Sequence, residues 1–140
     1  MFDVYGIDRL NKWKEFRDSL EDNPEPMQAV VDFWNRAPFV SSYLDPQNPE
    51  AWPDPWHLVL DSKLDNLAIC LGMLYTLKLT QRFMDSVCEI HMSMSSKDID
   101  RQYFLVVEDQ VLNFRYGEIM HKDCISGVQT SKLLSVKTLP

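Results

Sequence analysis

The sequence predicts an α+β fold in which N-terminal helices and one central helix pack on an antiparallel sheet. Apolar residues recur at three- and four-residue steps before residue 80, which is the period of an amphipathic helix. After residue 86 they alternate with polar residues at a period of two, which is typical of half-buried strands. We expect one domain over 1–140, with a helical lead at 1–37, a proline and aromatic loop at 38–60, a central helix at 61–80 and antiparallel strands at 86–138.

Two helices are expected in the helical lead. The first begins near Asp8, which would cap it, and its apolar stripe consists of Ile7, Leu10, Trp13, Phe16 and Leu20. The second starts at Pro24 or Pro26, because proline is tolerated in a first helical turn, and Pro38 ends it. Its apolar face consists of Met27, Val30, Val31 and Trp34.

The proline and aromatic loop is expected to be ordered, since Tyr43, Trp52 and Trp56 are costly to leave in water. Its last part, 55–60, has the pattern of one helical turn. The central helix follows from about Ser62 to Leu79 and carries the strongest apolar stripe of the chain. Ala68 and Gly72 lie one turn apart in it, so we expect another backbone to approach closely there.

The alternating part of the sequence predicts an antiparallel meander. The first strand is marked by Cys88, Ile90, Met92 and Met94, and a turn follows at 94–101. A continuous apolar strand is expected at 103–107, and a turn at 108–110 leads into a strand at 111–114. Weaker strand patterns lie at 119–120, 125–128 and 133–136.

Composition and charge limit the function. With 140 residues, 45% of them hydrophobic, the chain is long enough for one core and too short for two domains. Its formal net charge of −7 disfavours nucleic acid, whose affinity for proteins comes chiefly from Lys and Arg, and it disfavours anionic membranes. We therefore expect a protein partner or self-association, with no nucleic acid, no membrane and an oligomeric state that the sequence leaves open.

The cysteines and the N-terminus favour an intracellular protein. Cys70, Cys88 and Cys124 are odd in number and far apart, which indicates reduced thiols. The first residues lack the basic start and apolar run of a signal peptide. The longest apolar stretch, 64–79, is too short and too polar to span a membrane. We expect a protein that is not secreted and has no transmembrane segment.

The middle half of the chain carries a recognisable order of segments. A tryptophan and proline segment at 52–58 precedes the start of a long helix at 62–68, and a strand hairpin follows at 102–107 and 111–113. This order resembles the transglutaminase-like fold, which is related to papain. In that family the helix begins at a cysteine, and the hairpin supplies a histidine and an aspartate. The resemblance implies a transglutaminase-like, papain-like arrangement of the α+β fold.

The positions that would carry catalysis in that family hold other residues here. Leu64 stands at the position of the nucleophile, Gln102 at that of the base and Asn113 at that of the orienting carboxylate. Leucine has no nucleophilic atom, and glutamine cannot accept a proton near neutral pH, although asparagine can orient a histidine. We therefore expect no enzyme, no catalytic residue and a structural or protein-interaction role.

A second resemblance concerns origin. Residues 52–83 are similar to small proteins of T4-like bacteriophages of marine cyanobacteria. This implies a viral protein, either a virion component or an assembly factor, located in the virion or in the cytoplasm of the host cell. A small regulatory protein directed at a host protein is the alternative.

Other chemistry was weighed against structural roles. A cysteine-dependent hydrolase or transferase would use Cys70 with His91 or His121, but a thiol inside a core helix is more often a buried apolar group. His121 and Cys124 have the spacing of half a zinc site, and the second pair is missing, so we expect no metal and no cofactor. Asp54 and Asp65, with Asp61 between them, are expected to cap helices rather than bind a cation.

An aromatic set completes the candidates. Partner binding is expected at Trp52, Trp56, Phe39 and Tyr43, since aromatic residues dominate binding hot spots. The alternative, which base rates of burial favour, is that these side chains anchor the loop on the core.

Overall fold

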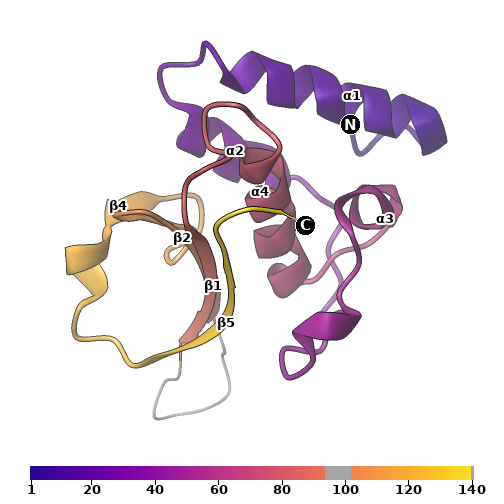
Figure 1. Cartoon of the computed structure of the whole chain (residues 1–140). Coiled ribbons are helices and arrows are strands. Elements are labelled where there is room, and N and C mark those ends of the chain that lie inside the picture. Colours follow the sequence, from indigo (N-terminus) through magenta and orange to yellow (C-terminus); the bar gives the residue numbers. More distant parts are fainter. Residues whose placement is uncertain (94–101, 140) are drawn as a thin grey trace.

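The computed structural model describes residues 1–93 and 102–139, and it shows an α+β fold (Figure 1). Within these residues the helices are α1 (Gly6–Leu20), α2 (Pro26–Trp34), α3 (Pro55–Leu60) and α4 (Asn66–Lys78), with short 3₁₀ turns η1 (Pro49–Ala51) and η2 (Lys122–Ile125). The strands are β1 (Cys88–Ser93), β2 (Gln102–Val107), β3 (Gln110–Leu112), β4 (Ile119–His121) and β5 (Thr130–Val136). The predicted turn at 94–101, with Met94, lies outside the described residues.

The helix α4 forms the centre of the molecule. It lies against β1 and β2 on one side, and α2 and α3 contact it from other sides (Figure 1). Apart from Asn66 and Tyr75, all its residues are buried, so it is apolar on nearly every face. Helices therefore cover one face of the sheet, and α4 is the layer between that face and the other helices.

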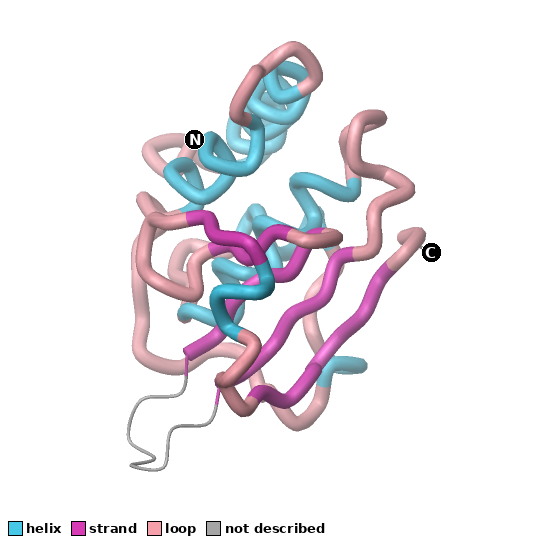
Figure 2. Tube along the Cα trace, turned by 90° about the vertical axis from the view of Figure 1, so that its left-hand side faces the viewer, coloured by secondary structure: helices cyan, strands magenta, loops and turns pink. Residues whose placement is uncertain are grey.

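The sheet is a meander of four strands with a fifth strand that returns. Its order is β4-β3-β2-β1-β5, with every neighbouring pair antiparallel. The chain leaves β4 through η2 and crosses the face of the sheet that α4 leaves free, so it reaches β5 at the opposite edge (Figure 2). The expected meander is thus wrong for the last strand, which pairs with β1 instead of β4.

The strand predicted at 125–128 is also wrong. Ile125 ends η2, and a turn follows in which the Val128 N–H donates to the Ile125 carbonyl at 2.9 Å. Val128 is exposed on this crossing connection. With no neighbouring strand to pair with and no core to enter, an apolar alternation of this length does not form a strand.

The start of α1 differs from the prediction as well. The helix begins at Gly6 rather than near Asp8, and no side chain caps it. Gly6 has a φ of 59°, a conformation that glycine adopts without strain. The buried guanidinium of Arg9 holds the preceding residues, since its Nε donates to the Val4 carbonyl at 2.8 Å. Arg9 Nη1 also donates to the Asp61 carbonyl at 2.8 Å, so a long-range contact of Arg9 holds the start of the helix in place of a local cap.

The start of α2 at Pro26 is confirmed, and this helix ends at Trp34, before Pro38. The close approach expected at Gly72 is made by a side chain instead of a backbone. A Cβ atom at Gly72 would lie 2.5 Å from the Trp34 ring, so the ring fills the space that this glycine leaves. The small residue therefore serves to seat α2 on α4.

Candidate functional site

A small cleft lies at the N-terminal end of α4, where the resemblance places the catalytic site. It has a volume of about 120 Å³ and is lined by Asn66, Gln102, Tyr103, Asn113, Phe114 and Tyr116. The structure thus brings Gln102 and Asn113 together, next to the first residue of α4. Leu64 lies two positions before Asn66 in the chain and does not line the cleft.

Leu64 belongs to the core. Its side chain is only 1% exposed, and its backbone forms a parallel bridge with Phe39. The Leu64 N–H donates to the Pro38 carbonyl at 2.9 Å, and the Val40 N–H donates to the Leu64 carbonyl at 3.1 Å. The bridge at Leu64 and the extended conformation of the N-cap Asp65 keep the preceding residues out of the helix, so α4 begins at Asn66 and not at Ser62 as predicted.

Asn113 is engaged in the turn that follows β3. Its φ of 67° lies in the left-handed region, which asparagine tolerates better than most residues. Its Oδ1 accepts from Asn35 Nδ2 at 3.0 Å and from the Gly117 N–H at 2.9 Å, and its Nδ2 donates to Asn35 Oδ1 at 3.2 Å. The side chain therefore ties the turn to the end of α2.

The thiols and imidazoles of the alternative catalytic set are not assembled. Cys70 and Cys88 are buried, and burial raises the pKa of their thiols to about 12 and about 11. Cys124 is exposed. Ile90 lies in the same core cluster as Cys70. Because successive residues of a strand point to opposite faces, His91 faces away from Cys70.

The imidazoles make local contacts. His91 Nε2 lies 3.1 Å from Glu89 Oε1, and His91 stacks on the Phe104 ring. His121 Nδ1 accepts from the Asp123 N–H at 3.2 Å. Among residues 1–93 and 102–139, no three His, Cys, Asp or Glu side chains are grouped to hold a metal ion. In the same residues no helix has both the length and the apolar character that a membrane span requires.

The second site is an aromatic groove between the proline and aromatic loop and the edge of the sheet. Its volume is about 500 Å³, and its lining comprises Pro49, Trp52, Pro53, Asp54, Pro55, Trp56, Tyr75, Leu79, Leu134, Val136 and Leu139. One wall consists of prolines and aromatic rings, and β5 with the residues after it supplies aliphatic side chains opposite. We call this site the aromatic groove.

The loop wall of the aromatic groove is held in place by hydrogen bonds. Trp52 Nε1 donates to the Asp45 carbonyl at 2.7 Å, and the Tyr75 hydroxyl donates to the Pro53 carbonyl at 2.7 Å. Asp54 caps α3, because its Oδ1 accepts from the His57 N–H at 2.9 Å. These bonds give the rings a defined position before any ligand arrives.

Trp56 is the most exposed ring of the groove wall, at 46%. One side of it is supported by the buried Trp13 ring, whose centroid lies 5.6 Å away in an edge-to-face arrangement. The Arg17 guanidinium stacks 4.4 Å from the Trp13 centroid and 5.8 Å from that of Trp56. Trp56 is thus braced from α1 and remains open toward the groove.

Phe39 and Tyr43 do not line the aromatic groove. Phe39 is 57% exposed beside Leu64, and the Tyr43 hydroxyl bonds to the Asp61 carboxylate. Burial and this carboxylate raise the pKa of the Tyr43 hydroxyl. Of the four aromatic candidates, only Trp52 and Trp56 therefore line the aromatic groove. Leu134 and Val136 were missed, because the strand pattern at 133–136 does not indicate which loop it faces.

Asp65 joins the proline and aromatic loop to the start of α4, and its hydrogen bonds lead to a prediction for stability. Its Oδ1 accepts from the Ala68 N–H at 2.8 Å, while its Oδ2 accepts from the N–H groups of Tyr43 at 2.8 Å and Leu44 at 3.0 Å. We expect Asp65→Ala to lower the free energy of unfolding in urea by about 2–4 kcal/mol, because three largely buried N–H donors lose their acceptor. Asp65→Asn keeps one acceptor oxygen, so it should lower the free energy of unfolding by less than Asp65→Ala. If the two substitutions lower it equally, the remaining oxygen does not contribute as proposed.

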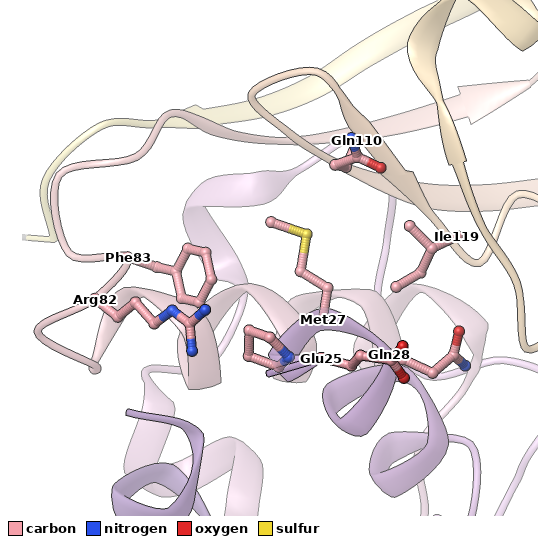
Figure 3. Close-up of a pocket in the computed structure, with 8 residues that line it drawn as sticks. Glu25, Met27, Gln28, Arg82, Phe83, Gln110 and Ile119 are labelled. Carbon is pink, nitrogen blue, oxygen red and sulfur yellow. The ribbon is translucent and has the colours of Figure 1, made fainter. Parts of the chain in front are cut away.

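A third hollow lies between α2 and the sheet (Figure 3). Its volume is about 480 Å³, and the Met27 side chain extends into it between Phe83 and Ile119 (Figure 3). Arg82 also lines this hollow. Its guanidinium is already hydrogen-bonded, since Nη1 donates to the carbonyls of Leu20 at 3.1 Å and Asn23 at 2.6 Å. A ligand in this hollow would therefore meet an arginine whose Nη1 already donates to two backbone carbonyls.

Comparison with known proteins bears on the fold. No protein-family model and no curated protein matches the chain. Among solved structures, LapG of Legionella pneumophila is similar, with a TM-score of 0.66 and 16% sequence identity over 91% of this chain and 76% of LapG. LapG has a transglutaminase-like fold of the cysteine protease type. The fold of this chain is transglutaminase-like. The predicted fold class is therefore confirmed.

The same comparison corrects one expectation. From Leu64, Gln102 and Asn113 we expected that the chain is not an enzyme. That expectation is wrong, because the fold that the chain shares with LapG is of the cysteine protease type and points toward an enzyme. Gln102 and Asn113 describe two positions of one cleft, and Leu64 lies in the core beside it, so these three side chains do not decide the chemistry of the rest of the surface.

Proposed function

We propose that this chain is a protein-interaction protein that binds a polypeptide segment of its partner in the aromatic groove. The observation that carries the proposal is the groove itself, in which Trp52, Trp56 and Tyr75 face the aliphatic side chains of Leu134 and Val136. Its volume of about 500 Å³ lies in the range of ligand sites. The fold supports a polypeptide as ligand, since proteases with this fold act on polypeptides.

The physical advantage of the aromatic groove is preorganisation. Rigid aromatic side chains supply a large contact area and lose little conformational entropy on binding. Trp52 and Tyr75 are already fixed by hydrogen bonds to the loop, and Trp56 rests on Trp13. Binding of a ligand that covers Trp56 would gain most of the free energy of burying the Trp56 ring, because this side chain is already held in place before the ligand binds.

A cysteine-dependent hydrolase is the second candidate, favoured by the likeness to LapG. Reaction at Cys70 would require this thiol to leave the core, where its pKa is raised to about 12. The viral origin, with a role in the virion, in assembly or against a host protein, stays a prediction from the sequence. Each of those roles is compatible with a polypeptide ligand.

The binding function is tested by selecting peptides from a random display library on the wild-type chain. Selected peptides are then measured by fluorescence anisotropy against Trp56→Ser. We expect this substitution to weaken binding at least about tenfold, which corresponds to about 1.4 kcal/mol for a hot-spot aromatic residue.

Phe39→Ser is the matched control, because Phe39 is an exposed aromatic residue outside the aromatic groove. It should leave the affinities unchanged. If no peptide is enriched, or if the enriched peptides bind Trp56→Ser as tightly as wild type, the proposed function is wrong.

A further inference from the structure

We infer that the segment bound in the aromatic groove is a basic, proline-containing segment in the polyproline II conformation. This inference rests on the proposed function and specifies its ligand. It follows from three properties of the aromatic groove, namely its charge, the character of its strand edge and one free donor.

The charge of the loop wall favours a cationic ligand. Between Pro38 and Asp61 the sequence contains four carboxylates and no lysine or arginine; they belong to Asp45, Glu50, Asp54 and Asp61. Asp54 lies in the lining of the groove. Its carboxylate accepts a hydrogen bond from the His57 N–H, and this bond holds the pKa of the Asp54 carboxyl below its usual range. This carboxylate therefore remains charged at physiological pH.

Most neighbouring basic side chains already have partners within the chain, and none of them is in the groove lining. The His57 imidazole Nδ1 lies 2.8 Å from Asp54 Oδ2. Arg17 stacks on the rings of Trp13 and Trp56. Lys132 of β5 lies 3.3 Å from Glu89 Oε2. Lys137, after β5, is exposed. A ligand with Lys or Arg opposite Asp54 gains an attraction that a ligand with Glu or Asp does not.

The sheet edge favours a ligand that does not add as a strand. The pairing of β5 with β1 shifts register between Ile90 and His91, which marks an irregularity in β5, and β5 also carries Lys132. Such irregularities and lysines protect edge strands against pairing with another chain. A polyproline II segment needs no strand partner, because its contacts come from proline rings packed on aromatic rings.

Trp56 supplies the directional contact. Within residues 1–93 and 102–139 its indole N–H has no hydrogen-bond acceptor, whereas that of Trp52 donates to the Asp45 carbonyl. The carbonyl groups of a polyproline II segment are free of internal hydrogen bonds. The Trp56 N–H can therefore donate to a ligand carbonyl while the neighbouring rings hold the prolines.

The test uses three fluorescein-labelled synthetic peptides and the full chain in an anisotropy titration. The first alternates proline and leucine and carries two arginines, the second replaces the arginines by glutamates, and the third replaces the prolines by alanines. We expect the proline and arginine peptide to bind at least about tenfold more tightly than either of the others. Equal affinities, or no binding of the first peptide, would overturn the inference.

Two variants isolate the contacts. Asp54→Asn removes the charge and keeps the helix cap, since asparagine caps as well as aspartate, so the preference for arginine over glutamate should shrink severalfold. Asp109→Asn makes the same change in net charge at the β2–β3 turn, outside the groove lining, and should leave the preference intact. Trp56→Phe keeps a ring without the N–H and should weaken the first peptide less than Trp56→Ser.

The two proposals fail separately. Display-selected peptides that require Trp56 but contain neither proline nor basic residues would overturn the ligand class and leave the binding function standing. Peptides that bind independently of Trp56 would overturn both.

Discussion

Replacing Thr76 by valine should lower the free energy of unfolding by about 2–6 kcal/mol. The Thr76 hydroxyl accepts from Trp13 Nε1 at 3.0 Å and from Trp34 Nε1 at 2.8 Å, and all three side chains are fully buried. Valine has the shape of threonine without the oxygen, so two indole N–H groups would lose their acceptor, at about 1–3 kcal/mol each. Urea unfolding followed by circular dichroism measures the change.

Thr76→Ser is the control for this prediction, since it keeps the hydroxyl and removes one methyl group at about 1 kcal/mol. If valine and serine destabilise the protein equally, the hydroxyl does not hold the two tryptophans. The prediction also concerns the groove, because Trp13 supports Trp56. We therefore expect Thr76→Val to weaken the binding of groove peptides as well.

Iodoacetamide should label one thiol of the native protein quickly, that of Cys124. Cys124 is exposed, whereas Cys70 and Cys88 are buried. Burial raises the pKa of the Cys70 thiol to about 12, so very little thiolate forms at pH 7, and burial also blocks access of the reagent. Cys70 and Cys88 should thus react orders of magnitude more slowly. Mass spectrometry of digests taken over time measures the three rates.

The same labelling in denaturant provides the control, because all three thiols should then react at similar rates. Rapid labelling of Cys70 in the native protein would contradict its burial. It would also favour the hydrolase candidate over the binding function, since a nucleophilic thiol must reach its substrate.

The helices were largely predictable because local forces define them. Proline geometry set the start of α2 at Pro26, and apolar periodicity placed α4 to within a few residues. The boundaries that were wrong depend on distant partners. The bridge between Phe39 and Leu64 delays α4, and the hydrogen bond from Arg9 to the Asp61 carbonyl holds the start of α1.

The candidate site was predictable in part. Gln102 and Asn113 were placed together through the family resemblance, and they do share a cleft. Trp52 and Trp56 were singled out as aromatic residues of one loop, and they share the aromatic groove. Phe39 and Tyr43 belong to the same loop in sequence and lie elsewhere in the structure. Proximity along a loop does not indicate which surface each side chain faces.

Residue order alone was enough for the α+β class, most kinds of elements and the burial of the Cys70 thiol, because helical and strand periods and proline constraints act over a few residues. Three-dimensional packing settled that β5 returns to β1, that Leu134 and Val136 face the tryptophans, and that one hydroxyl serves two indoles. The partners of that hydroxyl lie 63 and 42 positions from it in the chain. Contacts at such separations form only when the whole core assembles, so no local pattern contains them.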